Sequence, residues 1–237
     1  MKAFMSGRRV TSSGLALLLY VVMCTQGWAH GVGESDAAFI AQGASARIGP
    51  FLYLGAKHMV TGYDHLLFLF GVIFFLYRFR EVALYVTLFA VGHSVTLLTG
   101  VLNEWQFNPW LIDAIIGLSV VYKAFDNMGG FQSVFGVQPD TRAAVLLFGL
   151  AHGFGLATKL HELELSAKGL VPNILAFNVG VELGQIVALS LILVVMTWWR
   201  AKAAFARQAF AANVLLMAAG FVLMEYQLAG YFLPGGA

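Results

Sequence analysis

The sequence predicts an all-α protein, a polytopic bundle of transmembrane helices. Of its 237 residues, 59% are hydrophobic and only 11% are charged, whereas a soluble domain is roughly 25% charged. The mean hydropathy is +0.79, so most of the chain must lie in lipid, where apolar surface is not exposed to water. The apolar runs do not alternate as transmembrane strands do. A helical bundle is then the structure that satisfies the backbone in a bilayer.

Charge and motifs exclude several classes of protein. The chain has 14 Lys and Arg against 12 Asp and Glu, a net charge of +2, so it lacks the strongly basic surface of a nucleic-acid-binding protein. It contains neither a Gly-rich phosphate loop nor a G-x-S-x-G nucleophile motif. Its single cysteine, Cys24, excludes an intramolecular disulfide framework and a cysteine-based zinc site.

Residues 1–29 have the anatomy of a cleavable secretory signal peptide. A basic start, a short apolar run and a pair of small residues precede His30. Cleavage there would remove Cys24 and leave His30 at the N-terminus, where its amine and imidazole could chelate one metal ion together. An uncleaved signal anchor and a lipoprotein cut before Cys24 are the alternatives. Residues 30–50 would form an extracytoplasmic segment.

Residues 51–237 form the predicted six-helix transmembrane domain. Their hydropathy divides into six stretches, each near the ~20 residues that cross a bilayer as a helix. These stretches are residues 51–77, 82–102, 109–126, 142–159, 170–199 and 208–229.

Basic residues predict the orientation of the six spans. Seven of them flank or occupy three alternate loops: Arg78, Arg80, Lys123, Arg142, Arg200, Lys202 and Arg207. The loop over residues 103–108, which falls on the other side, has no Lys or Arg. Because cytoplasmic loops carry the excess of basic residues, we expect a bacterial-type inner membrane protein with both mature termini outside the cytoplasm.

The predicted spans carry ionisable side chains, which are costly inside a bilayer and therefore indicate function. In the first span His58 and His65 are seven residues apart, so they lie on nearly one face of a helix, and Asp64 adjoins His65. The topology places six candidate metal ligands together in the outer half of the bilayer. They are His58, Asp64, His65, His93, His152 and Glu182.

Three further residues are additional candidates for the metal site. Asp113 is at similar depth, where it is a ligand or a hydrogen-bonding helix-packing residue, and His30 and His161 would lie above the group on the exported side. A lone membrane histidine such as His93 also serves as an interhelical hydrogen-bond partner. Imidazole and carboxylate groups without thiolate suit divalent Ni, Co, Zn or Cu, whereas Mg²⁺ and Ca²⁺ prefer oxygen ligands.

Pairs of glycines bracket two of these candidates. Gly149 and Gly153 flank His152, and Gly180 and Gly184 flank Glu182. Small residues four apart let helix backbones approach closely. Ordinary helix packing explains these glycines, and the same close approach would bring His152 and Glu182 to one ion.

The sequence resembles the HupE/UreJ family over about residues 50–200. The motifs that carry the resemblance are His58-x5-Asp64-His65 with Gly62, the His93-Ser94 pair, Phe148-Gly-Leu-Ala-His152-Gly-Phe-Gly155 and Phe177-Asn-Val-Gly-Val-Glu182-Leu-Gly-Gln185. The resemblance implies a membrane protein of nickel or cobalt uptake, with His58, Asp64 and His65 as the metal-motif residues. Met59 stands where the short members have proline, so the chain is more similar to the longer, divergent branch.

Three functions fit this pattern. The favoured one is a permease for a divalent transition metal, with nickel or cobalt as cargo, rather than an enzyme. The second is an intramembrane metal-dependent hydrolase, with Glu182 or Asp64 as general base. The third is a non-catalytic metal-handling or assembly protein on the periplasmic side. A permease needs an inward route, yet the cytoplasmic half of the predicted bundle shows no second set of ligands.

Overall fold

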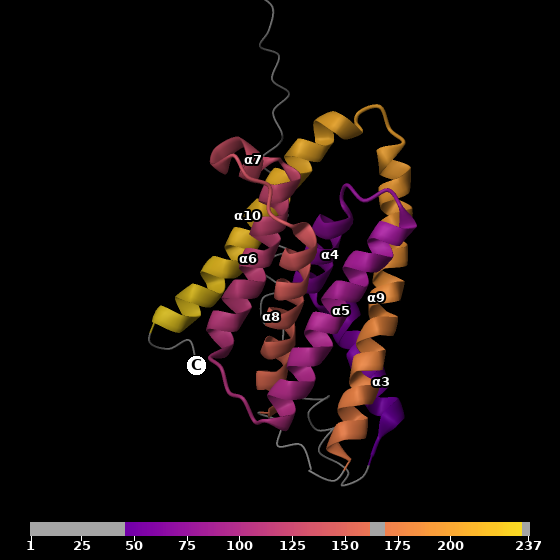
Figure 1. Cartoon of the computed structure of the whole chain (residues 1–237), viewed down its shortest axis with the longest axis vertical. Helices are drawn as coiled ribbons and strands as arrows, with labels where there is room; N and C mark the ends of the chain where they lie inside the picture. Colours follow the sequence, from indigo (N-terminus) through magenta and orange to yellow (C-terminus); the bar gives the residue numbers. More distant parts are fainter. Residues whose placement is uncertain (1–45, 162–168, 234–237) are drawn as a thin grey trace, which may run out of the picture.

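The computed structural model describes residues 46–161 and 169–233, and every regular element in these ranges is a helix (Figure 1). The all-α prediction is therefore confirmed for the described part of the chain. The predicted signal peptide, Cys24 and His30 lie outside the described residues, and so does most of the segment over residues 30–50.

The described helices follow one another with short connections. They are α3 (Ile48–Thr61), α4 (Tyr63–Ile73), α5 (Phe79–Leu102), α6 (Pro109–Asn127), α7 (Gly130–Phe135), α8 (Thr141–His161), α9 (Leu170–Arg200) and α10 (Phe205–Phe232). Four of them, α5, α8, α9 and α10, are long and apolar enough to cross a membrane. These helices indicate a multi-pass membrane protein.

The first predicted span is not one continuous helix, so that expectation is wrong. It divides at Gly62, whose extended backbone (φ −71°, ψ 97°) separates α3 from α4. A Cβ atom added at Gly62 would lie 3.0 Å from the His58 carbonyl oxygen and 3.0 Å from Nδ1 of His65. The break therefore lies among the polar side chains of the span, and the sequence gives no clear sign of it because glycine is frequent in transmembrane helices.

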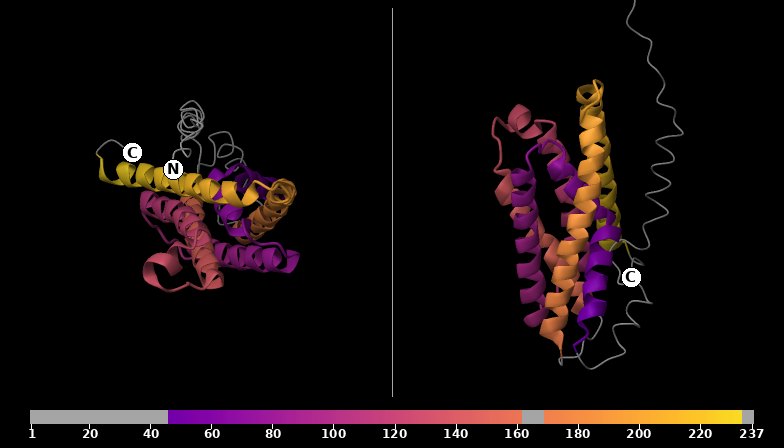
Figure 2. Two further views of the ribbon diagram at one scale, coloured as in Figure 1. Left: turned by 90° about the horizontal axis from the view of Figure 1, so that it is seen from above. Right: turned by 90° about the vertical axis from the view of Figure 1, so that its right-hand side faces the viewer.

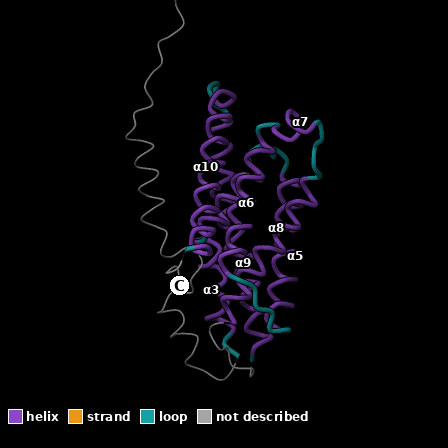
Figure 3. Tube along the Cα trace, turned by 90° about the vertical axis from the view of Figure 1, so that its left-hand side faces the viewer, coloured by secondary structure: helices purple, strands orange, loops and turns teal. Residues whose placement is uncertain are grey.

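The long helices pack in three pairs, α3 with α9, α5 with α8 and α6 with α10. Figure 2 shows α3 lying alongside the first half of α9, and Figure 3 shows the long helices gathered in one bundle. Within it α10 is clearly inclined to α9 (Figure 1). Glycine contacts set the close approach: a Cβ atom on Gly184 would lie 2.7 Å from the Ala56 carbonyl oxygen, and one on Gly149 would lie 2.5 Å from that of Phe89.

The contacts within each pair fix the helix directions. Gly180 faces Leu52 and Gly184 faces Ala56, so α3 and α9 run parallel. In the same way Gly149 faces Phe89 and Gly153 faces His93, which makes α5 and α8 parallel.

The third pair runs in opposite directions. Gly117 of α6 faces Met224 of α10, and Gly220 faces Val121, so α6 and α10 are antiparallel. These directions agree with a chain that passes back and forth through the bundle.

One end of the bundle carries most of the basic residues of the described chain, and we call it the basic end. Figure 1 shows that α7, the α4–α5 connection and the α9–α10 connection all lie there. The basic residues of this end are Arg78, Arg80, Lys123, Arg142, Arg200, Lys202 and Arg207. The guanidinium of Arg200 donates hydrogen bonds to the carbonyl oxygens of Ile73, Phe74 and Leu76. It thereby satisfies carbonyl groups at the end of α4, which a helix leaves without partners.

Replacing Gly149 by valine tests the α5–α8 contact. The added side chain would collide with the backbone at Phe89, and overpacking of this kind costs about 1–3 kcal/mol or more. We expect a lower midpoint of thermal unfolding for the detergent-purified protein. Gly49→Val is the matched control, because nothing lies within 4 Å of a Cβ at Gly49. Equal midpoints for the two variants would contradict the packing described.

Candidate metal centre

The centre is built around His65, in the first turn of α4. Nδ1 of His65 lies 3.0 Å from Oδ1 of Asp64, and both residues are only 1% exposed. Asp64 is itself in the first turn, where the backbone N–H groups of a helix favour negative charge. An ionised carboxylate accepts a hydrogen bond from Nδ1–H and leaves Nε2 of the ring as the metal-binding nitrogen.

His152 approaches His65 from α8. The two ring centroids are 4.7 Å apart. One donor atom from each of Asp64, His65 and His152 lies within 4.8 Å of the other two, an arrangement that could hold a metal ion, and all three residues are buried. We call this set the buried triad. It offers one carboxylate and two imidazoles from two different helices, so an ion bound there would link α4 to α8.

Two further predicted histidines lie beside the buried triad. The ring of His58, in the last turn of α3, is centred 5.0 Å from that of His65. The ring of His93, on α5, is centred 6.2 Å from it. His93 is 1% exposed, and within the described residues neither of its ring nitrogens has a hydrogen-bond partner. Four helices, α3, α4, α5 and α8, thus bring imidazoles together.

Aromatic rings close the surroundings of the buried triad. Phe89 lies with its ring centre 5.0 Å from that of His152, and Phe68 lies 5.6 Å away. Both phenylalanines are 1% exposed. Because such a wall lowers the local dielectric, it strengthens the attraction between the carboxylate and a cation.

Asp113 is buried on α6 and lies near the triad without being part of it. Its Oδ1 is 3.5 Å from the position of a Cβ at Gly155, one helical turn from His152 on α8. The structure therefore places Asp113 against the helix that carries His152, whereas the donor atoms that lie together are those of the buried triad.

Glu182 is not brought to the histidines. Its side chain is exposed on α9 and lines a groove between α5 and α9. Gly180 and Gly184 pack on α3 rather than on α8. Residues two apart are about 200° apart around a helix, so Glu182 points away from the face that these glycines pack. The expectation that close helix packing brings His152 and Glu182 to one ion therefore does not fit this geometry.

Two predicted residues remain, His30 and His161. His30 lies outside the described residues, and the side chain of His161, at the end of α8, is likewise not described. Sequence reasoning missed one neighbour of the centre, Ser119 of α6, whose Oγ lies 3.4 Å from Nε2 of His152. A serine within an apolar helix was the available signal.

A family model described as HupE / UreJ protein matches residues 34–234, nearly the whole chain. The chain belongs to the HupE/UreJ family. No curated protein and no solved structure matches it. The suspected resemblance is thus confirmed, and this HupE/UreJ protein carries the motif residues His58, Asp64 and His65 at the break between α3 and α4. Family and fold together are consistent with a transporter-like role linked to metal.

The metal content of the purified HupE/UreJ protein tests the buried triad. After loading with Ni²⁺ or Co²⁺ and removal of free ion, we expect wild type to retain metal and His65→Ala and His152→Ala to lose most of it, because each removes a donor. Elemental analysis per mole of folded protein gives the result. Glu225→Gln, which changes an exposed carboxyl of α10, is the control. Metal content that is the same in all four proteins would rule out this site.

Proposed function

We propose that this HupE/UreJ protein is a permease for a divalent transition metal cation, with Ni²⁺ and Co²⁺ as its cargo. The observation that carries the proposal is the position of the buried triad at a break in a helix. Transporters bind substrate and ions near the bilayer midplane, at helices that are discontinuous there. Gly62 provides such a discontinuity, with His58 on one side and Asp64 and His65 on the other.

We also propose that the chain crosses the membrane six times. α3 and α4 together make the first crossing, and α6 joins the four helices that qualify on their own. α6 is less apolar because it carries Asp113, Lys123 and Asp126; the last two form a buried ion pair that a membrane protein tolerates as a pair. The alternation of helix directions supports six crossings. The excess of basic residues at the basic end supports its location in the cytoplasm of a bacterial-type cell.

The chemistry of the triad favours a transition metal as cargo. A buried carboxylate is costly without a compensating charge, and a divalent cation compensates it more fully than a neutral imidazole does. Imidazole ligands favour Ni, Co, Zn or Cu over Mg²⁺ or Ca²⁺. A hydrolase would also need a general base beside the metal, but Asp64 is held by His65 and Glu182 lies outside the group. The geometry therefore favours transport over hydrolysis.

Uptake by purified protein in proteoliposomes tests the proposal. Wild type is expected to accumulate Ni²⁺ or Co²⁺ inside the vesicles, whereas His65→Ala should match protein-free vesicles because the ion cannot enter the triad. Glu225→Gln again serves as the control. Retention of metal by wild type without accumulation would identify a metal-handling protein instead of a permease.

The break at Gly62 is tested separately. In Gly62→Val the new side chain would crowd Nδ1 of His65 and the carbonyl of His58, both 3.0 Å from its Cβ. We expect uptake to fall by roughly tenfold or more, since misplacing a positioned group by an ångström can cost about a hundredfold. Gly49→Val, in α3, should retain uptake. Normal uptake by Gly62→Val would show that the break has no part in transport.

A further inference from the structure

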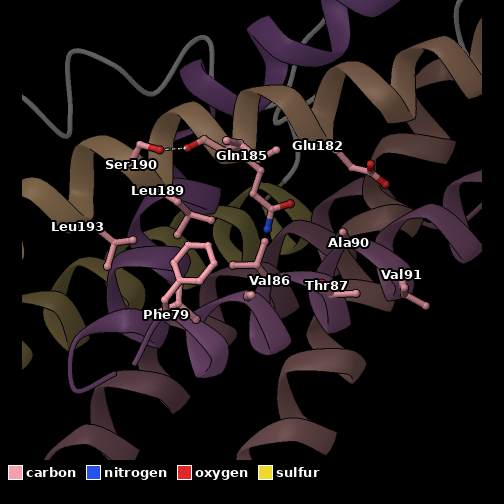
Figure 4. Close-up of a pocket in the computed structure, with 13 residues that line it drawn as sticks. Phe79, Val86, Thr87, Ala90, Val91, Glu182, Gln185, Leu189, Ser190 and Leu193 are labelled. Atoms are coloured by element: carbon pink, nitrogen blue, oxygen red, sulfur yellow. Dashed lines mark hydrogen bonds between the residues drawn. The ribbon is translucent and has the colours of Figure 1, made fainter. Parts of the chain in front are cut away.

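A groove runs along the seam between α5 and α9 (Figure 4). Its volume is about 450 Å³. The walls are mainly aliphatic, formed by residues such as Val82, Val86, Val91, Ile186, Leu189 and Leu193. Two strongly polar side chains interrupt them, Glu182 and Gln185, one helical turn apart on α9.

The groove connects the level of the metal centre with the basic end. Oγ of Ser94, the residue after His93, donates a hydrogen bond to Oδ1 of Asn178 over 3.4 Å, which joins α5 to α9 just beyond the groove. One turn further along, Val91 and Glu182 begin the lining, and Phe79 is its last residue on α5. Phe79 is also the first residue of that helix, next to Arg78 at the basic end.

The buried amide of Gln185 distinguishes this groove from an ordinary gap between packed helices. Its side chain is 1% exposed, and within the described residues neither its amide nitrogen nor its amide oxygen has a hydrogen-bond partner. Figure 4 shows the amide directed from α9 into the groove, toward Val86 of α5. Buried amides are nearly always hydrogen-bonded, to protein or to water. An unpartnered amide in this place therefore points to water or a ligand in the groove.

We propose that this groove is the water-filled inward route of the cation. The Glu182 carboxylate and the Gln185 amide oxygen would form a second, weaker binding site within it. The proposal rests on the permease function above. A carboxylate in a transmembrane helix is costly against lipid, and such residues face water-filled cavities and mark ion pathways. One carboxylate and one amide oxygen hold Ni²⁺ or Co²⁺ less strongly than imidazoles do. Conduction needs sites that bind weakly enough to release the ion.

This route supplies what the metal centre alone does not. The buried triad is enclosed by Phe68 and Phe89, and the Ser94–Asn178 hydrogen bond closes the seam at that level. Separation of α5 from α9 at this bond would let the ion pass from the triad to Glu182. From there the groove leads toward Phe79 and the cytoplasm. The cation would thus meet the tightly binding triad first and the weakly binding Glu182 site second.

Thiol labelling tests whether the groove holds water. With Cys24 replaced by serine, Val86→Cys places a thiol in the lining, and Val187→Cys places one on α9 at the same level but outside it. A charged, membrane-impermeant thiol reagent is added to inside-out vesicles. We expect Val86→Cys to react and Val187→Cys to remain unlabelled. Labelling of neither thiol, or labelling of Val86→Cys only by a lipid-soluble maleimide, would overturn the proposal in favour of a lipid chain or a partner helix.

Transport by Glu182 variants tests the second, weaker binding site. We expect Glu182→Gln to lower the initial rate of Ni²⁺ uptake by roughly tenfold or more, a barrier increase of about 1.4 kcal/mol. Glu182→Asp should recover part of the rate, and the metal retained by the buried triad should stay at the wild-type level. A wild-type rate of uptake by Glu182→Gln would overturn the second binding site without contradicting the permease function. If wild type itself moves no metal, the permease function fails, and the labelling result alone decides whether the groove is aqueous.

Discussion

The contact between Asp64 and His65 is the constraint on which the rest of the structure depends. Both side chains are buried, and Nδ1 of His65 lies 3.0 Å from Oδ1 of Asp64. A carboxylate there needs a compensating charge, and an oriented imidazole with a second imidazole from His152 provides a place for a cation to supply it. The helix break at Gly62, the close packing of α5 on α8 and the aromatic wall all serve to hold these groups together.

The sequence predicted most of the long helices well because each of them is a long apolar run. The predicted limits of the stretches at 109–126 and 170–199 differ by a residue from α6 and α9. The break at Gly62 was not predicted in this way, because a lone glycine within a transmembrane helix is common and does not by itself interrupt the helix. The need for glycine at this position follows from the structure, because a side chain there would meet the His58 carbonyl and the His65 ring.

The candidate site was predicted in part, for a physical reason that differs between residues. His58, Asp64 and His65 are neighbours along the chain, so helical spacing alone placed them together. His93 and His152 were grouped with them on predicted depth, and it is the parallel pairing of α5 with α8 that brings them together. Glu182 was grouped with them on depth and on the glycines that flank it. Depth does not give the direction of a side chain around a helix, and the flanking glycines turn Glu182 to the groove on the other face of α9.

X-ray absorption spectroscopy of the Ni²⁺-loaded protein tests the central claim most directly, because it reports the atoms bound to the ion. The account predicts imidazole scattering from two histidines together with oxygen ligands and no sulfur. His65→Ala and His152→Ala should each remove one imidazole contribution from whatever metal remains. A spectrum with oxygen ligands only, or one that is unchanged in both variants, would contradict the claim that the buried triad binds the metal.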